Sequence, residues 1–465
     1  MNRNNFLPHI AIAVVLILVA AFAGQLRRWQ QHWKQTVRII PAADKKRDVM
    51  SKTDTIRYEP PAFSKPEVLV KFKSDVNHES IDRIALRLHD RIEDSIESVP
   101  GLTSIDDLDD ASADSVAAQY RAMAEVEYAE PIFDISLDSV SPVFPQDPRF
   151  EEQWALVNNG QNGGKQGADI SAGIAWTKTT GSEKVVVAVL DSGVDYNHPD
   201  LEKNMWERPP IIMKYNDPDI GTIEDLHGYN ALENSADPMD DNGHGTHCAG
   251  IIGAEGENNI GIAGVNWKVQ IMPLKFMNAG GFGTTKDAIE AINYVIDRKK
   301  AGVNVRIISA SWGSTQKSRA LEDVIRKAYE NDILFVAAAG NASVNNDTQP
   351  HFPSSYNVPN VISVAALDRN DKLASFSNYG PKSVAIGAPG VQILSTWLGD
   401  EFEEKSGTSM ATPVVAGVAA LMLAQNPKLT VDQLRSRILA SVDPLDSLKG
   451  KVSTGGRINA AKALE

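Results

Sequence analysis

The segment Ser406-Gly-Thr-Ser409-Met-Ala-Thr-Pro413 leads directly into an apolar stretch from Val414 to Ala424. Proline suits the first turn of a helix, where its missing N–H group costs nothing, and a stretch that is apolar on all sides predicts a buried helix. Ser409 would then lie at the N-terminal end of that helix, where free backbone N–H groups and the helix dipole favour developing negative charge. A serine in this position is also an ordinary helix cap, so this segment alone does not establish a catalytic site.

Two other segments carry the groups that a nucleophilic serine requires. Asp191 ends an apolar, β-branched run that begins at Val185, which predicts a buried strand. His244 opens a stretch of small residues that continues to Gly250. A serine nucleophile needs a base to take its proton, and the base needs a carboxylate that holds its tautomer and stabilises its charge. The chain supplies these groups in the order aspartate, histidine, serine.

With these three motifs in this order, the chain resembles the subtilase family of subtilisin-like serine endopeptidases. An α/β-hydrolase would carry the serine first, in a G-x-S-x-G motif, and no such motif surrounds Ser409. The resemblance implies that Ser409 attacks the scissile carbonyl, His244 accepts its proton and Asp191 orients His244. His247 competes as the base, but the family pattern Gly-His-Gly-Thr-His places the base at the first histidine, so we expect His247 to be structural.

Two segments between the histidine and the serine also match the family. Asn341 follows an apolar run, and a Gly-Asn pair after a strand is by itself only a turn signal. The resemblance implies that Asn341 donates a hydrogen bond to the oxyanion, and that the substrate pairs as an added β-strand along residues 309–313. The substrate-binding residues implied in this way are Ser311, Trp312, Gly313, Ala338, Ala339 and Gly340. Their small walls predict a roomy, apolar pocket without an acidic group, which argues against specificity for dibasic sites.

The resemblance also implies a structural calcium site, because calcium binds several oxygen ligands from side chains and backbone carbonyls. The implied ligands are Gln153, Asp200 and Asn258 through their side chains, and Gly256, Ile260 and Ile262 through their carbonyls. Asp237, Asp240 and Asp241 form a second acidic group. This second group either holds another ion or is a solvated turn.

The second part of the chain alternates near-continuous β-branched runs with helical patterns; the runs are residues 185–190, 303–309, 333–338 and 361–366. Such runs predict an α/β fold with a mainly parallel sheet that is buried on both faces. Capping-box patterns at Thr284 and Thr430 predict the starts of two helices. The resemblance implies the subtilisin-like three-layer fold for a catalytic domain at residues 146–465, with residues 202–241 as a surface insertion.

Residues 61–137 are expected to form a small separate unit. Residues 67–73 alternate like a strand, and residues 78–89 have helical spacing. This part resembles the inhibitor I9-type propeptide of subtilases, which has a ferredoxin-like α+β fold. The resemblance implies that the unit assists folding, inhibits its own protease domain and is removed autocatalytically between about Leu137 and Pro145.

The N-terminus carries an apolar run at residues 10–24, which is shorter than the roughly 20 residues of a membrane-spanning helix. An A-x-A-like cleavage site near its end predicts that residues 1–24 are a cleaved signal peptide, so that the protein is secreted or extracytoplasmic. Basic residues follow at once, and in an uncleaved anchor they would favour keeping the C-terminal side in the cytosol. A membrane tether through residues 6–24 and a cytosolic protein are therefore the alternatives. Residues 25–60 are polar and basic and are expected to be a linker.

The 465 residues carry a formal net charge of −14, which favours solubility and argues against nucleic acid as a partner. Cys248 is the single cysteine, so intramolecular disulfides are excluded. Cys248 follows His244 by about one helical turn, and we expect it to be a small buried residue beside the site rather than a catalytic thiol. The expected partners are polypeptide substrates and the propeptide, and the expected state is a monomer.

Three alternatives to an exported protease are open at this point. A pseudoprotease, a binding scaffold of the same fold, would lack a catalytic residue, whereas Asp191, His244, Ser409 and Asn341 are all present. A different serine hydrolase, such as an esterase, is disfavoured by the motif order and by the substrate-strand motif. A membrane-tethered protease would differ in localisation rather than in chemistry.

Overall fold

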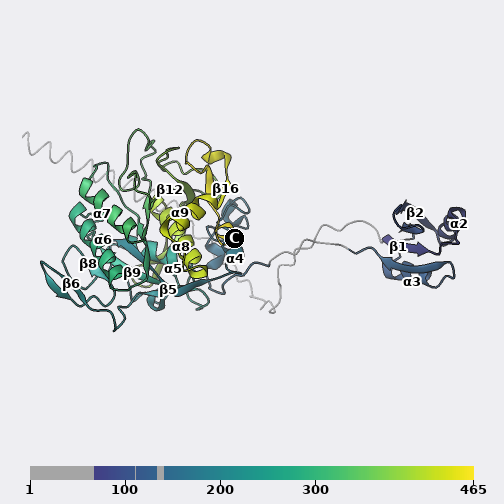
Figure 1. Cartoon of the computed structure of the whole chain (residues 1–465), viewed down its shortest axis with the longest axis horizontal. Coiled ribbons are helices and arrows are strands. Elements are labelled where there is room, and N and C mark those ends of the chain that lie inside the picture. Colours follow the sequence, from purple (N-terminus) through teal and green to yellow (C-terminus); the bar gives the residue numbers. More distant parts are fainter. Residues whose placement is uncertain (1–66, 110, 134–140) are drawn as a thin grey trace, which may run out of the picture. The chain divides into compact units, whose positions relative to one another are not determined.

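The computed structural model in Figure 1 describes residues 67–109, 111–133 and 141–465. Contacts between residues divide the chain into two units, Met1–Ile135 and Ser136–Glu465. The expected signal or anchor at residues 1–24 and the expected linker at residues 25–60 lie outside the described residues. Both assignments stay predictions, as does the role assigned to each unit.

The first unit alternates strands and helices in the order βαββαβ. Its elements are β1 (Glu67–Phe72), α2 (His78–Leu88), β2 (Asp90–Ser95), β3 (Leu102–Asp107), α3 (Ala113–Arg121) and β4 (Val126–Pro131). The strands form one antiparallel sheet in the order β2-β3-β1-β4. Val68 and Val70 of β1 pack in one core with Ile81 of α2 and Tyr120 of α3. This is the ferredoxin-like arrangement that the resemblance implies.

The second unit is organised around a 9-stranded sheet in the order β16-β17-β13-β12-β11-β10-β5-β9-β8. Neighbouring strands are parallel except for β16 and β17, so the predicted α/β class with a mainly parallel sheet is confirmed. The strands are β5 (Gly181–Asp191), β8 (Tyr229–Asn230), β9 (Lys268–Lys275), β10 (Val305–Ala310), β11 (Leu334–Ala338), β12 (Val361–Leu367), β13 (Ile386–Pro389), β16 (Val442–Pro444) and β17 (Gly456–Ile458).

Helices cover both faces of this sheet and form the outer two of three layers. Alternate residues of β5 belong to two separate cores, as the two-residue repeat of a strand requires. Val187 belongs to the core that contains residues of α5 (His244–Gly253), α8 (Thr408–Gln425) and α9 (Val431–Ala440). Ala188 belongs to the core that contains residues of α6 (Thr285–Lys300) and α7 (Arg319–Glu330), which are green in Figure 1.

Smaller elements complete the unit. Both predicted capping boxes are present, because Thr284 and Thr430 exchange hydrogen bonds with Asp287 and Gln433. The remaining strands and helices are β6 (Tyr215–Asp217), β7 (Gly221–Ile223), β14 (Ile393–Trp397), β15 (Glu401–Lys405), α4 (Ala172–Ala175) and α10 (Ala460–Ala463). Four 3₁₀ turns lie at Phe150–Glu152, Gln161–Gly163, Glu202–Asn204 and Asp446–Leu448.

The helix that follows the serine segment begins earlier than predicted. It starts at Thr408, so Pro413 lies inside α8 and not in its first turn. Proline has no N–H group, and the carbonyl of Ser409, four residues earlier, therefore has no helical partner. Instead this carbonyl accepts hydrogen bonds from Ser311 Oγ at 2.8 Å and from Cys248 Sγ at 3.5 Å. The start of α8 is thus held by the end of β10 and by α5.

Among the described residues, only α8 has the length and composition of a membrane-spanning helix. Of its residues, 83% are buried in the protein, against the sheet and the neighbouring helices. We therefore interpret α8 as the central core helix of this unit, as the apolar pattern predicts.

The segment at residues 202–241 is anchored on α6 by a buried ionic cluster. Asp225 is 0% exposed, and its Oδ2 accepts hydrogen bonds from the Tyr294 hydroxyl at 2.9 Å and from Arg298 Nη1 at 3.1 Å. Arg208 Nε lies 3.0 Å from the other carboxylate oxygen. The desolvated charges of the cluster compensate one another. Removal of any one of them would leave an uncompensated buried charge, which is strongly destabilising.

Asp225→Asn is expected to destabilise the protein by about 3–5 kcal/mol, because the guanidinium groups of Arg208 and Arg298 lose their buried counter-ion. The melting temperature should fall by roughly 10 °C, measured by differential scanning calorimetry. Asp219→Asn is the matched control, since Asp219 is an exposed aspartate in the same segment. Equal melting temperatures for Asp225→Asn and Asp219→Asn would contradict this account of the insertion.

Candidate active site

The four predicted catalytic residues come from element ends at one edge of the large sheet. Asp191 is the last residue of β5, and Asn341 closely follows β11. His244 is the first residue of α5, and Ser409 is the second residue of α8. Because β10 lies between β5 and β11 and all three are parallel, their carboxyl ends meet at this edge, where ligands bind in open α/β sheets.

Asp191 and His244 form a close pair. Asp191 Oδ1 lies 2.7 Å from His244 Nδ1, and the Asp191 side chain is 1% exposed. Burial lowers the pKa of His244, but the charge and hydrogen bond of Asp191, with the charge of Asp240, outweigh burial and leave this pKa above its ordinary value. The carboxylate holds the imidazole with its other nitrogen, Nε2, free to accept a proton.

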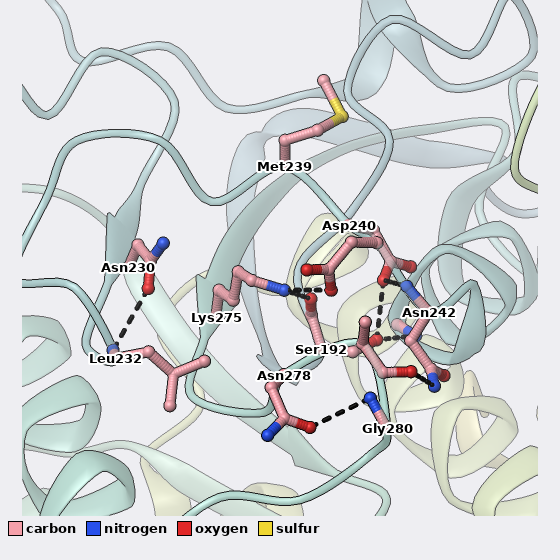
Figure 2. A network of polar contacts seen from close by, with 12 residues as sticks. Ser192, Asn230, Leu232, Met239, Asp240, Asn242, Lys275, Asn278 and Gly280 are labelled. Carbon is pink, nitrogen blue, oxygen red and sulfur yellow. Dashed lines mark hydrogen bonds and ion pairs between the residues drawn. The ribbon is translucent and has the colours of Figure 1, made fainter.

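Asp240 joins the backbone segments that carry this pair. Its Oδ1 accepts hydrogen bonds from the Ser192 hydroxyl at 2.8 Å and from the backbone N–H of Gly243 at 3.0 Å. Ser192 follows Asp191 and Gly243 precedes His244, so one buried carboxylate fixes the two catalytic residues relative to each other. Figure 2 shows Asp240 directed at Ser192 within this polar network.

The acidic group of Asp237, Asp240 and Asp241, predicted either to hold a second ion or to be a solvated turn, makes hydrogen bonds within the protein. Asp240 Oδ2 is already engaged by the Thr246 hydroxyl at 2.7 Å and by the Thr246 N–H at 3.0 Å. Asp241 pairs with Lys275 at 2.6 Å, and Asp237 accepts a hydrogen bond from a tyrosine hydroxyl at 3.0 Å. Each carboxylate therefore has its own protein partner.

Asp240→Asn is expected to move the acidic limb of the kcat/KM profile to lower pH. The Asp240 charge raises the pKa of His244, and a general base must be neutral, so a variant without this charge stays active at lower pH. The measurement is kcat/KM for a peptide anilide across the acidic limb. Asp237→Asn is the control, and an acidic limb that is unmoved in Asp240→Asn would refute the electrostatic role of Asp240.

The Ser409 hydroxyl faces the end of β10. Ser409 Oγ donates a hydrogen bond to the Ser311 carbonyl at 3.0 Å, while Ser311 Oγ donates to the Ser409 carbonyl at 2.8 Å. The described contacts contain no hydrogen bond from Ser409 Oγ to His244. In the absence of substrate such catalytic contacts are often long, and they tighten when a substrate binds.

Cys248 and His247 lie beneath the site as predicted. Among the described residues, one group could hold a metal ion. It consists of Asp191, His244 and Cys248, whose possible ligand atoms all lie within 4.8 Å of one another. Burial raises the pKa of Cys248 well above its ordinary value, so the thiol stays protonated and donates to Ser409. His247 Nε2 lies 2.9 Å from the Glu403 carbonyl, and burial lowers the pKa of His247 to about 3. His247 is a neutral structural residue.

Asn341 is held through its amide oxygen, and its NH₂ group makes no hydrogen bond within the part of the chain that the structure describes. Its Oδ1 accepts hydrogen bonds from the Thr408 N–H and the Thr408 hydroxyl, both at 2.9 Å. Because a backbone N–H can only donate, the amide oxygen must face Thr408 and the NH₂ group must point away from it. The side chain is exposed beside the start of α8, where an NH₂ group can stabilise a developing oxyanion.

The predicted substrate strand lines one wall of an open groove of about 270 Å³. Its lining residues are Asp191, Ser192, Asn242, His244, Met277, Gly281, Ser311, Trp312 and Gly313. Trp312 is fixed by a hydrogen bond from Nε1 to the Leu190 carbonyl at 2.9 Å and by its contact with Phe276. Asn242, Met277 and Gly281 were not predicted, because no local signal connects them with the serine segment.

The prediction of a roomy, apolar pocket needs correction. Ala338 and Ala339 are buried, and Ala339 packs in a core cluster rather than toward solvent. The ring of His351 lies directly against the other two predicted walls, because a Cβ atom on Gly313 would be 2.1 Å from His351 Cε1 and one on Gly340 would be 3.0 Å from Cδ2. An imidazole therefore occupies the space that the small walls predicted to be open.

Asp200, a predicted calcium ligand, lies against the loop that contains Asn258 and Ile262. The Asp200 carboxylate accepts hydrogen bonds from the Asn258 side-chain amide at 2.7 Å and from the Ile262 N–H at 3.0 Å. Burial, together with the charges of Asp147 and Glu255, raises the pKa of Asp200 to about 7. A buried carboxylate near other acidic groups, with oxygen-bearing partners, fits a hard cation such as calcium.

The predicted ligand Gln153 lies at the end of this loop. Its amide exchanges hydrogen bonds with the backbone of Ala263, which follows Ile262, at 2.8 and 2.9 Å. Asp147, which was not predicted, also contacts the loop and accepts hydrogen bonds from the N–H groups of Glu257 at 2.9 Å and Asn259 at 3.1 Å. Gly256 and Ile260 belong to the same loop, as expected.

A buried carboxylate paired with an imidazole, beside a serine at a helix start and a free amide donor, defines a serine hydrolase on an α/β fold. Residues 182–456 match the model of the subtilase family. The chain is 32% identical over 417 residues to a thermophilic serine proteinase from Bacillus sp. (strain AK1), covering 88% of this chain and 90% of that one. It is 36% identical over 296 residues to thermitase from Thermoactinomyces vulgaris, covering 64% of this chain and 94% of thermitase.

A solved structure agrees with these sequence matches. A protease from Pseudoalteromonas arctica is similar with a TM-score of 0.57 and 27% identity, covering 69% of this chain and 98% of that one. The chain belongs to the subtilase family. It is a subtilisin-like serine endopeptidase.

Proposed function

We propose that the protein hydrolyses peptide bonds with an Asp191–His244–Ser409 triad, and that it is made as a self-processing proenzyme. The observation that carries the proposal is the 2.7 Å contact between buried Asp191 and His244, at the sheet edge where Ser409 opens α8. Ser409 Oγ attacks the scissile carbonyl while His244 Nε2 takes its proton. His244 returns that proton to the leaving amine, and a water molecule then hydrolyses the acyl-enzyme.

Asn341 and the end of β10 act on the substrate backbone. The Asn341 amide donates to the oxyanion of each tetrahedral intermediate, with its orientation fixed by Thr408. Residues 311–313 bind the peptide as an added strand, which gives main-chain hydrogen bonds with limited sequence selectivity. An esterase would use the same triad but not the strand contact. A comparison of the hydrolysis of peptide and ester substrates of equal length therefore distinguishes the two functions.

The first unit acts as the propeptide in this proposal. Its order β2-β3-β1-β4 with two helices is that of a compact ferredoxin-like domain, and it precedes the protease domain in one chain. Bound in the cleft it would inhibit the enzyme and assist folding until Ser409 cuts the connection. Export through residues 1–24 accompanies this role, with a membrane tether through the same segment as the alternative.

Intact mass spectrometry of the full chain, wild type and Ser409→Ala, expressed with calcium, tests the proenzyme. Wild type should lose the Met1–Ile135 unit, and Ser409→Ala should keep it. Ser406→Ala is the matched control in the same segment and should mature like wild type. Identical processing of wild type and Ser409→Ala would show that another protease matures the chain, and an unprocessed but soluble wild type would favour the pseudoprotease.

Calcium is the proposed structural cofactor of the protease domain. Asp200, Asn258 and Asp147 would hold it, with carbonyls of the loop at residues 256–262 completing the oxygen ligands. A bound cation would compensate the repulsion between the buried Asp147 and Asp200 carboxylates, which raises the pKa of Asp200 in addition to the effect of burial.

Removal of calcium with a chelator is expected to lower the stability of the mature enzyme by about 3 kcal/mol when calcium had been present at 100 times its Kd. The melting temperature should then drop by roughly 5–10 °C and recover when calcium is added back. Asp200→Asn should melt at one temperature with and without calcium, whereas Asp323→Asn, on the surface of α7, should respond like wild type. A chelator effect that survives in Asp200→Asn would exclude this site.

A further inference from the structure

The geometry around Ser409 defines where the substrate side chain before the scissile bond must lie. β10 and β11 are adjacent parallel strands, and each ends in a glycine-containing segment, at Gly313 and Gly340. Ser409 Oγ lies against the Ser311 carbonyl, and the Asn341 amide lies beside the start of α8. For a carbonyl carbon bonded to Ser409 with its oxygen on Asn341, we expect the substrate side chain to lie between these two segments.

His351 closes the space between the two segments. Its ring contacts both glycines, since a Cβ atom on Gly313 would lie 2.1 Å from Cε1 and 2.6 Å from Nε2, and one on Gly340 would lie 3.0 Å from Cδ2. Glycine at both positions is what allows the imidazole to approach the two backbones so closely. The ring thus lies between the two segments and forms the floor of the space that they enclose.

The backbone of this loop is held in place by hydrogen bonds on both sides of the ring. Phe352, the next residue, exchanges backbone hydrogen bonds with Ser314 at 2.7 and 2.8 Å, which attaches the loop directly beyond Gly313. Ser354 Oγ donates to the His351 carbonyl at 2.8 Å, and the His351 N–H donates to Ser355 Oγ at 3.2 Å. A substrate side chain therefore meets a fixed imidazole rather than a flexible surface group.

The ring is a titratable group in uncharged surroundings. Burial lowers the pKa of His351, and the Ala338 carbonyl acts in the opposite direction. The groups that face the ring are the Gly313, Gly340 and Ala338 backbones and the Ser354 hydroxyl, none of which carries a charge. Burial therefore favours the neutral form of the floor, and acidic solution favours its protonated form.

We propose that His351 determines the specificity for the residue before the scissile bond, by excluding large aromatic and basic side chains and by selecting glutamate in acidic solution. This inference rests on the proposed protease function. A neutral imidazole that closes the pocket at a shallow depth leaves room for small and medium-sized substrate side chains. An imidazolium attracts a carboxylate and repels lysine and arginine, and a bound carboxylate in turn favours the protonated ring.

The charge is tested with two peptide anilides that differ only in glutamate or glutamine before the anilide. Their ratio of kcat/KM cancels the titration of His244, which both substrates share. For wild type the glutamate-to-glutamine ratio should rise by about tenfold between pH 8 and pH 5, the scale of one charge-assisted hydrogen bond. In His351→Asn the ratio should stay constant. A ratio that is independent of pH in wild type, or that rises equally in His351→Asn, overturns the proposal.

The depth of the pocket is tested with phenylalanine and alanine at the same substrate position. His351→Gly should raise the phenylalanine-to-alanine ratio of kcat/KM by about tenfold or more. The phenyl ring of the substrate would be buried in the vacated space, where its contacts equal those of several methylene groups. Gln349→Gly is the matched control, since it adds a glycine to the same loop at an exposed residue. An unchanged ratio in folded His351→Gly contradicts the assignment of the floor.

These outcomes are distinct from failure of the protease function itself. If wild type hydrolyses no peptide and a fluorophosphonate leaves Ser409 unlabelled, the proposed function fails and His351 has no substrate to select. If peptides are cleaved but neither ratio responds, the protease stands and the inference about His351 is wrong. Should the His351 variants not fold, the pH dependence of the wild-type ratio decides by itself.

Discussion

Ser409→Ala is expected to lower kcat for peptide hydrolysis by about 10⁴- to 10⁶-fold, on the scale that measurements on subtilisin, a member of this family, have set for such a change. The variant loses the atom that forms the acyl-enzyme, and water must attack the substrate directly. Asn341 and the substrate strand are still present, so a residual rate above that of the uncatalysed reaction should remain.

The measurement is the steady-state hydrolysis of a peptide anilide after added trypsin has removed the first unit. The measured rate then does not depend on whether the variant can process itself. Ser406→Ala serves as the control, because its exposed hydroxyl accepts a hydrogen bond only from the Gln392 N–H. A loss of less than tenfold in Ser409→Ala would mean that another group attacks the substrate.

Asn341→Leu is expected to lower kcat by about 10²- to 10³-fold with little change in KM, which corresponds to about 2.7–4 kcal/mol of lost transition-state stabilisation. The amide NH₂ group contacts the oxygen only when negative charge develops on it, so the effect falls on the chemical step rather than on binding. Leucine has nearly the same shape, but it cannot donate a hydrogen bond.

The experiment compares kcat and KM of Asn341→Leu with those of Asn357→Leu, an exposed asparagine in a loop beyond the site. The Thr408 N–H also loses its acceptor in Asn341→Leu, so the melting temperature is recorded for both variants. A rise in KM at constant kcat would assign Asn341 to ground-state binding and not to the oxyanion.

The sequence predicts the parts of this protein that local patterns encode. The runs that became β5, β10, β11 and β12 are apolar on both faces, which only a covered parallel sheet explains. The capping boxes at Thr284 and Thr430 depend on residues three apart, and both are present. The four catalytic candidates were identified by their motifs and order, and the fold brings them to one edge of the sheet.

Residues that act through distant contacts could not be predicted in this way. Asp147 reaches the loop at residues 256–262 only because the chain before η2 (Phe150–Glu152) crosses it, and nothing near Asp147 indicates that crossing. His351 reaches Gly313 and Gly340 through a loop fixed by Ser314, which is far from it in sequence. The start of α8 before Pro413 depends on Ser311 and Cys248, which supply the hydrogen bonds that proline removes.

The β14–β15 hairpin supports the base in the same non-local manner. Thr396 Oγ1 donates to the Thr246 carbonyl at 2.8 Å and Ser395 Oγ donates to the His247 carbonyl at 2.7 Å, so β14 is bonded along the first turns of α5. Gly250 permits this approach, because a Cβ atom there would lie 2.3 Å from Thr396 Oγ1. Sequence patterns of the hairpin alone do not indicate which helix it contacts.

Labelling of the mature enzyme with diisopropyl fluorophosphate, followed by peptide mapping with mass spectrometry, tests the central claim most directly. The account predicts a single phosphoryl adduct on Ser409, and no adduct when His244 is replaced by alanine, because the hydroxyl then lacks its base. An adduct on another serine, or labelling of Ser409 that does not depend on His244, would contradict the assignment of the triad.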